Sequence, residues 1–238
     1  MTVFARFFCR WWLLVLAAVG VVGCASSASP VADVVSALVS VRFGSAPASS
    51  IPARPDPRYR YLRVEVEGRP AALLVLGYVD PHPQGDIEVW YSAKREVIKT
   101  QNGRIVGTFG LEVDWRSVQF APAPPAWSEL APQGSQYQYQ RLRDEMPGHR
   151  YAVTEQLALQ PWQGTPPLVL PAALPAALAR GYGWFRESTL SSTAQVLPPA
   201  WFALGVYLGQ TSVVYSEQCL ALHFCLKLLR WPLPESAS

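Results

Sequence analysis

The sequence contains few of the residues on which catalysis and metal binding usually depend. Its 238 residues include three histidines and four cysteines, and only 16% carry a charge. His82, His149 and His223 each stand alone in a turn or beside a strand end, and no serine or cysteine near them lies in a nucleophile motif. We therefore expect no catalytic residues, no metal site and no cofactor.

The N-terminus has the pattern of a targeting signal. Arg6 and Arg10 form a positive head, and residues 11–22 form an unbroken apolar run. A helix needs about 20 residues to cross a hydrocarbon core of about 30 Å, so this shorter run favours a cleaved signal over a permanent anchor. We predict a signal peptide over residues 1–23.

The end of this signal, Val-Val-Gly followed by Cys24, resembles the lipobox of bacterial lipoproteins. The resemblance implies that Cys24 becomes the first mature residue and carries diacylglycerol and an acyl chain such as palmitate, which together make a lasting anchor. Residue 25 is Ala, not the Asp that tends to hold such lipoproteins at the inner membrane. We therefore expect a lipid-anchored protein at the outer membrane, facing the periplasm. The alternative is an ordinary secretory signal followed by a structural cysteine.

A strong charge of either sign is also missing from the mature chain. Two of the 20 basic residues lie in the signal, which leaves 18 basic against 17 acidic residues and a net charge of about +1. Such a balance provides no electrostatic footprint for a nucleic acid, so nucleic acid is not an expected partner.

The mature chain is rich in turn-forming residues, with most of the 22 prolines and 16 glycines of the sequence. Residues 24–30 are small and polar and predict a tether, after which residues 31–238 form a single β-rich domain. Apolar residues at helical spacing predict one short amphipathic helix over residues 31–41. Beyond it, short apolar pieces between turn residues favour strands over long helices.

The Asn102-Gly103 pair gives the clearest local prediction. Both residues tolerate positive φ, as tight two-residue turns require, so Val97–Gln101 and Arg104–Phe109 should pair as an antiparallel hairpin. A second hairpin is predicted around Met146-Pro147-Gly148, and a third around Gly209-Gln210. Successive hairpins give an antiparallel meander, so we predict an all-β domain shaped as a barrel or a sandwich.

Only two cysteines remain once Cys9 is removed with the signal and Cys24 carries lipid. Cys219 and Cys225 lie six residues apart, in a compartment that is oxidising. We expect a disulfide between them, with a local effect on stability.

Several stretches of the chain resemble the YjbF/GfcB family of capsule and exopolysaccharide lipoproteins. They are the apolar run from Ala71, Glu88-Val-Trp-Tyr-Ser, Asn102-Gly-Arg-Ile-Val-Gly-Thr, Asp114-Trp115, Val214-Tyr-Ser-Glu-Gln-Cys and Arg230-Trp-Pro. The resemblance implies an all-β outer-membrane lipoprotein that works with machinery secreting a surface polysaccharide. It supplies no catalytic residues to transfer to this chain.

Two groups of residues are candidate sites. Trp90, Arg104 and Trp115 are the candidates for a glycan-binding face, because aromatic rings stack on sugars and neighbouring strands can place the three together. Four carboxylates on strands that are expected to be neighbours are the candidates for sugar-bond cleavage, which needs two carboxyl groups at a defined separation. They are Asp86, Glu88, Glu112 and Asp114.

The leading hypothesis is a non-enzymatic accessory lipoprotein that binds a glycan or a partner of the export machinery. A polysaccharide-modifying hydrolase or lyase is the alternative, and a purely structural envelope lipoprotein is a third possibility.

Overall fold

Asn102 and Gly103 form the turn predicted for them. In a computed structural model of the protein, which describes residues 51, 55–130, 136–164 and 166–233, their φ angles are 50° and 77°. The turn joins β4 (Val97–Gln101) to β5 (Arg104–Phe109), and Gln101 pairs directly with Arg104. A Cβ atom on Gly103 would lie 2.4 Å from Cβ of Val213, so glycine serves both the turn and its close packing.

Twelve antiparallel strands form one sheet, and each strand except the two at its ends pairs with two neighbours. The other strands are β1 (Tyr61–Val66), β2 (Ala72–Asp80), β3 (Ile87–Tyr91), β6 (Asp114–Ala121), β7 (Tyr137–Met146), β8 (Arg150–Trp162), β9 (Gly183–Ser192), β10 (Ala200–Tyr207), β11 (Gln210–Ala221) and β12 (Phe224–Trp231). Two short helical elements complete the described fold, the 3-10 turn η1 (Trp127–Glu129) and the helix α3 (Ala176–Gly181). The predicted helix over residues 31–41 lies outside the described residues.

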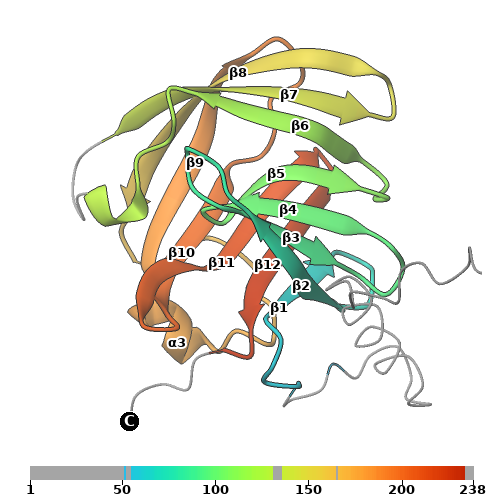
Figure 1. The fold of residues 1–238 in the computed structure, drawn as a ribbon. Coiled ribbons are helices and arrows are strands. Elements are labelled where there is room, and N and C mark those ends of the chain that lie inside the picture. Colours follow the sequence, from blue (N-terminus) through green and yellow to red (C-terminus); the bar gives the residue numbers. More distant parts are fainter. Residues whose placement is uncertain (1–50, 52–54, 131–135, 165, 234–238) are drawn as a thin grey trace, which may run out of the picture.

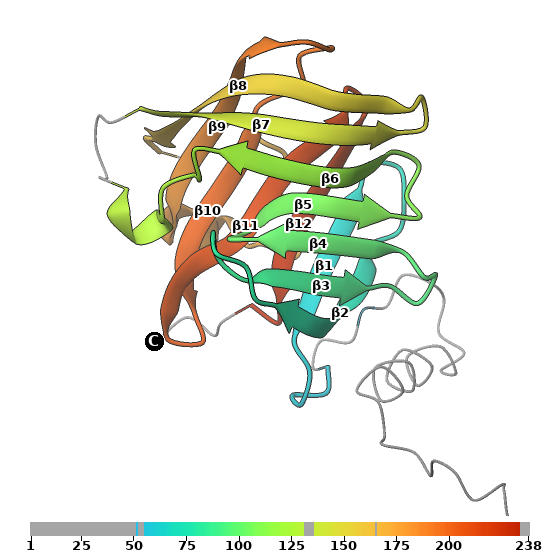
Figure 2. The ribbon, with the colours of Figure 1, turned by 45° about the horizontal axis from the view of Figure 1, so that its top comes forward.

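The sheet curls into a nearly closed barrel (Figures 1 and 2). Its strand order is β5-β4-β3-β2-β1-β12-β11-β10-β9-β8-β7-β6, so β5 and β6 are its two ends. The curl brings these ends side by side, where the backbone N–H of Trp115 donates a 2.9 Å hydrogen bond to the Thr108 hydroxyl. The predicted all-β meander of barrel type is therefore confirmed.

The hydrophobic core occupies both sides of one part of the curled sheet. Two clusters fill the interior, one around Trp90 and Trp115 and one around Tyr139 and Phe202. A third cluster packs α3 and the chain before it against β9 to β12. Burial on both faces explains why these strands do not alternate cleanly between apolar and polar residues.

Two sequence predictions about the C-terminal strands need correction. The third hairpin forms, but its turn is Leu208-Gly209, with φ angles of 50° and 76°, and Tyr207 pairs with Gln210. Glycine therefore takes the second turn position, whereas the sequence analysis placed it first. The strand β12, which the sequence analysis did not assign, pairs with β1 and joins the two ends of the described chain.

Candidate functional site

The structure places the predicted glycan-binding residues Trp90, Arg104 and Trp115 in the protein interior. Their exposed fractions are 0%, 3% and 1%. The indole N–H of Trp90 donates to the Thr100 hydroxyl at 2.9 Å, and that of Trp115 donates to the Leu220 carbonyl at 3.2 Å. The expectation that the three form an exposed face is wrong, because the sheet curls around them and their polar atoms are paired inside.

Arg104 belongs to a buried polar network that the sequence analysis did not foresee. Its Nε lies 3.2 Å from Glu187 Oε2, and its Nη2 lies 3.3 Å from the Tyr139 hydroxyl, which itself donates to Glu187. The ring centroid of Trp127 is 4.3 Å from the guanidinium carbon. Burial alone would lower the pKa of Arg104, but Tyr139 and Glu187 outweigh burial and raise the pKa, so the guanidinium stays charged.

The network continues along the inner face of β7. Nη2 of Arg141 and Nε of Arg143 lie 2.7 Å and 3.0 Å from Glu155 Oε2, and Arg143 also pairs with Glu145. Burial would raise the pKa of Glu155, but the two guanidinium groups outweigh burial and hold the pKa below its usual range. Both guanidinium groups also lie within 5 Å of the Trp115 ring centroid.

This network has the properties of a structural element. Three arginines, at 104, 141 and 143, balance three glutamates, at 145, 155 and 187, and each of the six is less than 9% exposed. The six groups pair with each other across β5, β7, β8 and β9, and Glu145 also pairs with Arg150, whose side chain is exposed at the surface. Their arrangement ties one half of the barrel together and offers a substrate no access.

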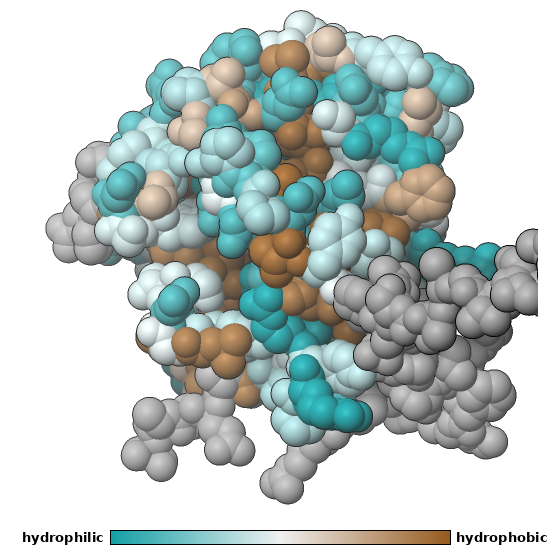
Figure 3. Space-filling model, viewed as in Figure 1, coloured by the Kyte–Doolittle hydropathy of each residue, from teal (hydrophilic) through white to brown (hydrophobic). Residues whose placement is uncertain are grey.

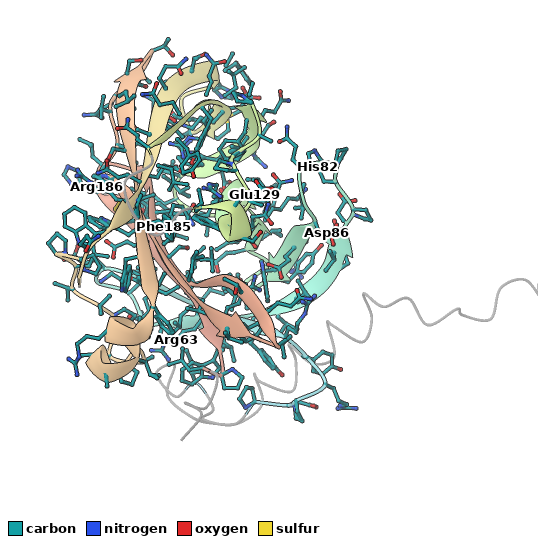
Figure 4. The ribbon with its side chains drawn as sticks, turned by 90° about the vertical axis from the view of Figure 1, so that its left-hand side faces the viewer. Arg63, His82, Asp86, Glu129, Phe185 and Arg186 are labelled. Atoms are coloured by element: carbon teal, nitrogen blue, oxygen red, sulfur yellow. A yellow bond between two sulfur atoms is a disulfide. The ribbon has the colours of Figure 1, made fainter. Side chains whose placement is uncertain are left out.

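The four carboxylates considered for sugar-bond cleavage have separate environments. Both oxygens of Glu88 accept hydrogen bonds from Arg230, Glu112 pairs with Arg69, and Asp114 accepts hydrogen bonds from the backbone N–H groups of Gly110 and Leu111. Asp86 is exposed on the β2–β3 turn, where Figure 4 shows it near His82 and across the molecule from Phe185 and Arg186. None of the four lines either of the hollows described below.

The structure joins the two C-terminal cysteines and places His82 among polar neighbours. Cys219 and Cys225 face each other on β11 and β12 and are joined by a disulfide, and Cys24 lies outside the described residues. His82 accepts a 3.2 Å hydrogen bond from the backbone N–H of Gln84 and lies 2.8 Å from the Gln101 amide nitrogen. Within residues 51, 55–130, 136–164 and 166–233, no three His, Cys, Asp or Glu side chains gather as a metal site would require.

Two hollows lie next to each other on the surface near the end strands β5 and β6. The first measures about 450 Å³, and the second about 320 Å³. Lys99 and Arg116 line both hollows, so we call the combined feature the seam groove. The first hollow is lined by His82, Gln84, Ile87, Lys99, Gln101, Val106 and residues 116–120, and the second by Tyr78, Val89, Tyr91, Val97, Lys99, residues 107–109 and Arg116.

Aromatic side chains form the walls of the second hollow. Tyr78 is 46% exposed and Phe109 is 53% exposed, so both rings are open to solvent at this hollow. Tyr91 lies over Gly77, at the point where the pairing of β2 with β3 shifts register. On the face viewed in Figure 3, apolar residues gather in a central run and in patches below it, with mainly hydrophilic residues around them.

One signal in the sequence, a pair of glycines inside strands, points to the seam groove. Gly77 and Gly107 both lie inside strands, where glycine weakens packing and often marks a bulge or a close approach of another group. Gly77 admits the Tyr91 ring, and Gly107 makes room for the Lys99 side chain, whose Cδ would lie 3.4 Å from a Cβ atom at position 107.

The fold first defines the class of protein: an all-β protein built on a nearly closed twelve-stranded antiparallel sheet. Residues 55–163, just under half of the chain, match the model of the YjbF family, which is described as group 4 capsule polysaccharide lipoprotein gfcB. The family resemblance inferred from the sequence is therefore confirmed over this part of the chain.

A solved structure shares the fold. The chain is similar to the hypothetical lipoprotein YmcC from Escherichia coli K12, with a TM-score of 0.53 and 17% sequence identity, over 89% of this chain and all of the other. No curated protein sequence shows a significant match to the chain. Among the residues that the structure describes, no helix has the length and apolar character to cross a membrane.

Proposed function

We propose that the protein is a non-enzymatic accessory lipoprotein in the secretion of a capsule or exopolysaccharide, and that it binds a glycan or a component of the export machinery. The observation that carries this proposal is that the residues matched by the family model include the seam groove. Every residue that lines the seam groove lies between positions 78 and 120, inside the matched range 55–163. The match to a capsule polysaccharide lipoprotein family thus contains the whole groove.

The proposed location is the periplasmic side of the outer membrane, with lipid on Cys24 as the anchor. Several acyl chains on one residue give a lasting attachment. An anchor also holds the domain close to export machinery in the same membrane, which raises its effective concentration there without any tight contact. A weak binding groove is enough for an accessory role under these conditions.

The carboxylates of the described fold are mostly paired with other groups of the protein, which supports a role without catalysis. Glu88, Glu112 and Asp114 each hold a partner within the fold, and the carboxylates of the interior network are closed to solvent. Sugar-bond cleavage requires two carboxyl groups that flank a substrate in a cleft.

A deletion strain of the native host tests the proposal. We expect deletion of the gene to reduce the amount of secreted polysaccharide and to leave its chain length unchanged, with recovery when the full gene is restored. A change in chain length would instead indicate a modifying enzyme. Normal amount and length together would indicate a purely structural envelope protein, and either result would overturn the proposal.

A further inference from the structure

The outer surface of β2 to β5 presents a row of four residues that lie directly side by side. Tyr78 pairs with Val89, Val89 with Lys99, and Lys99 with Gly107, so the row crosses four neighbouring strands. Side chains paired in this way lie about 5 Å apart on one face of a sheet. The row therefore consists of an exposed ring, an apolar floor, a cation and a glycine against which the cation's side chain lies.

A second row runs parallel to the first. Tyr91 pairs with Val97, and Val97 pairs with Phe109. The two rows give the groove aromatic side chains at both margins, with Val89 and Val97 between them. Flat rings with apolar faces suit the C–H faces of sugar rings, because stacking there buries apolar area while the sugar hydroxyls remain in water.

The charge in the groove has one sign. Lys99 and Arg116 line both hollows, and neither set of lining residues contains Asp or Glu. Within the part of the chain that the structure describes, neither cation forms an ion pair, although eleven ion pairs occur elsewhere. Nine of the thirteen described arginines pair with a carboxylate, and Arg116 is among the four that do not, so Lys99 and Arg116 bring two unpaired cations into one groove.

Arg116 is also held in a defined position. Its guanidinium carbon lies 4.7 Å from the Phe109 ring centroid, a cation–π contact across the β5–β6 seam. A planar guanidinium binds a carboxylate through two parallel hydrogen bonds, which is a more selective contact than the point charge of a lysine provides. The seam groove thus combines a bidentate donor, a second cation and aromatic walls.

We propose that the seam groove binds an anionic polysaccharide, whose sugar rings stack on Tyr78, Tyr91 and Phe109 while its acidic groups pair with Lys99 and Arg116. This inference rests on the proposed function, because it names the class of glycan that the accessory lipoprotein holds. Its specificity comes from charge: a neutral glycan gains the stacking contacts alone. The near-neutral net charge of the mature chain confines the attraction to this groove and provides little general affinity for polyanions.

Fluorescence anisotropy on the full-length protein in a neutral detergent tests this inference. The probes are a labelled oligogalacturonate, which is acidic, and a labelled oligosaccharide of dextran, which is neutral. We expect the acidic probe to bind about tenfold or more tightly than the neutral one, and added salt to reduce this difference.

Three variants locate the binding. The double variant Lys99→Gln/Arg116→Gln is expected to weaken acidic-probe binding about tenfold, to the level of the neutral probe. Arg58→Gln/Arg180→Gln removes the same charge from exposed positions outside the groove and should leave binding unchanged. Gly107→Leu displaces the Lys99 side chain, which lies against Gly107, and narrows the groove without changing charge, so it is expected to weaken the binding of both probes.

The results that would contradict the anionic-glycan site can be distinguished from those that would contradict the proposed function. Equal affinity for the two probes, or full binding by the Lys99→Gln/Arg116→Gln variant when its thermal unfolding matches that of the wild type, would overturn the anionic-glycan site. If neither probe binds while deletion of the gene still lowers secretion, the accessory function stands and the anionic-glycan site fails. A photo-crosslinker at Phe109 that captures an export protein in place of glycan would likewise assign the groove to a protein and overturn the inference.

Discussion

The Tyr91 ring lies directly against the backbone of Gly77. A Cβ atom on Gly77 would lie 2.4 Å from Cε2 and 2.6 Å from Cδ2 of that ring, which is closer than two non-bonded carbon atoms can approach. The absence of a side chain at position 77 therefore allows Tyr91 to form one wall of the seam groove.

Gly77→Ala is expected to displace Tyr91 and to destabilise the protein by about 1–3 kcal/mol, the range found for overpacked sites. Urea unfolding measures the change, and the acidic probe should bind more weakly to the variant. Gly107→Ala is the matched control, because its Cβ would lie 3.4 Å from the flexible Lys99 side chain. A Gly77→Ala variant with wild-type stability and binding would show that Tyr91 moves without consequence.

Glu155→Gln is expected to destabilise the protein by about 3–5 kcal/mol, because it leaves the buried Arg141 and Arg143 guanidinium groups without their shared carboxylate. Urea unfolding at neutral pH measures the loss. The control is Glu67→Gln, on an exposed turn, which should change stability by less than about 0.5 kcal/mol. Similar values for the two variants would contradict a structural role for the network.

The pKa of Glu155 predicts how the stability of the fold depends on pH. The pKa of Glu155 is lower in the folded protein than its usual value of 4.5, so the folded state favours the charged form. Its stabilisation is complete above that usual value and is lost as the pH falls through the lowered pKa of the folded state. The urea midpoint of the wild type should therefore fall on acidification below about pH 4.5, and that of Glu155→Gln should fall less steeply. Parallel curves for the two proteins would exclude Glu155 as the source.

Removal of the disulfide by Cys219→Ser/Cys225→Ser is expected to cost about 2 kcal/mol, since the bond closes a short loop with a sequence separation of six. The two cysteines lie outside residues 55–163 and do not line the seam groove. Probe binding should therefore persist in the folded variant. Unfolding curves with and without a reducing agent measure the cost, and the double variant should be insensitive to the reductant. Loss of binding by a folded variant would connect the disulfide to the groove.

Cys24→Ala is expected to move the protein from the membrane fraction to the soluble periplasmic fraction, because no other lipid attachment is predicted. Fractionation of cells, with immunoblotting, measures the shift. An ordinary secretory signal would give a soluble wild-type protein, which would remove the basis for the anchor. Metabolic labelling with a palmitate analogue distinguishes the two cases directly.

Local structure could be predicted best where a turn requires backbone φ angles that few residue types adopt. Asn102-Gly103 fixed one hairpin to the residue, since few other residues accept two consecutive positive φ angles. At Leu208-Gly209 the turn differs by one position, because Leu208 adopts positive φ and glycine follows it. Tertiary pairing therefore outweighed the local preference for glycine first.

The candidate site could not be predicted because β3 has apolar residues on both of its faces. Ile87, Val89 and Tyr91 alternate with Glu88 and Trp90, and sequence alone does not tell which set points inside a curled sheet. In the structure, Trp90 is fully buried. Glu88 lies on the same face of β3 and accepts a hydrogen bond from Arg230 of β12, a strand that was not predicted. Val89 and Tyr91, on the other face, form the floor and one wall of the second hollow.

The pairing of β1 with β12 bears on how the protein matures. Tyr61 and Trp231 are directly opposite each other in the register of two paired strands, although almost the whole domain separates them along the chain. Contacts between such distant segments form slowly, because a very long loop must close first. On the proposed route to the periplasm, the chain would cross the inner membrane from its N-terminus, and β1 would have one unpaired edge until β12 arrives, which favours aggregation. For the proposed periplasmic location, we therefore expect export to depend on protection of the incomplete sheet until the last strand has been translocated.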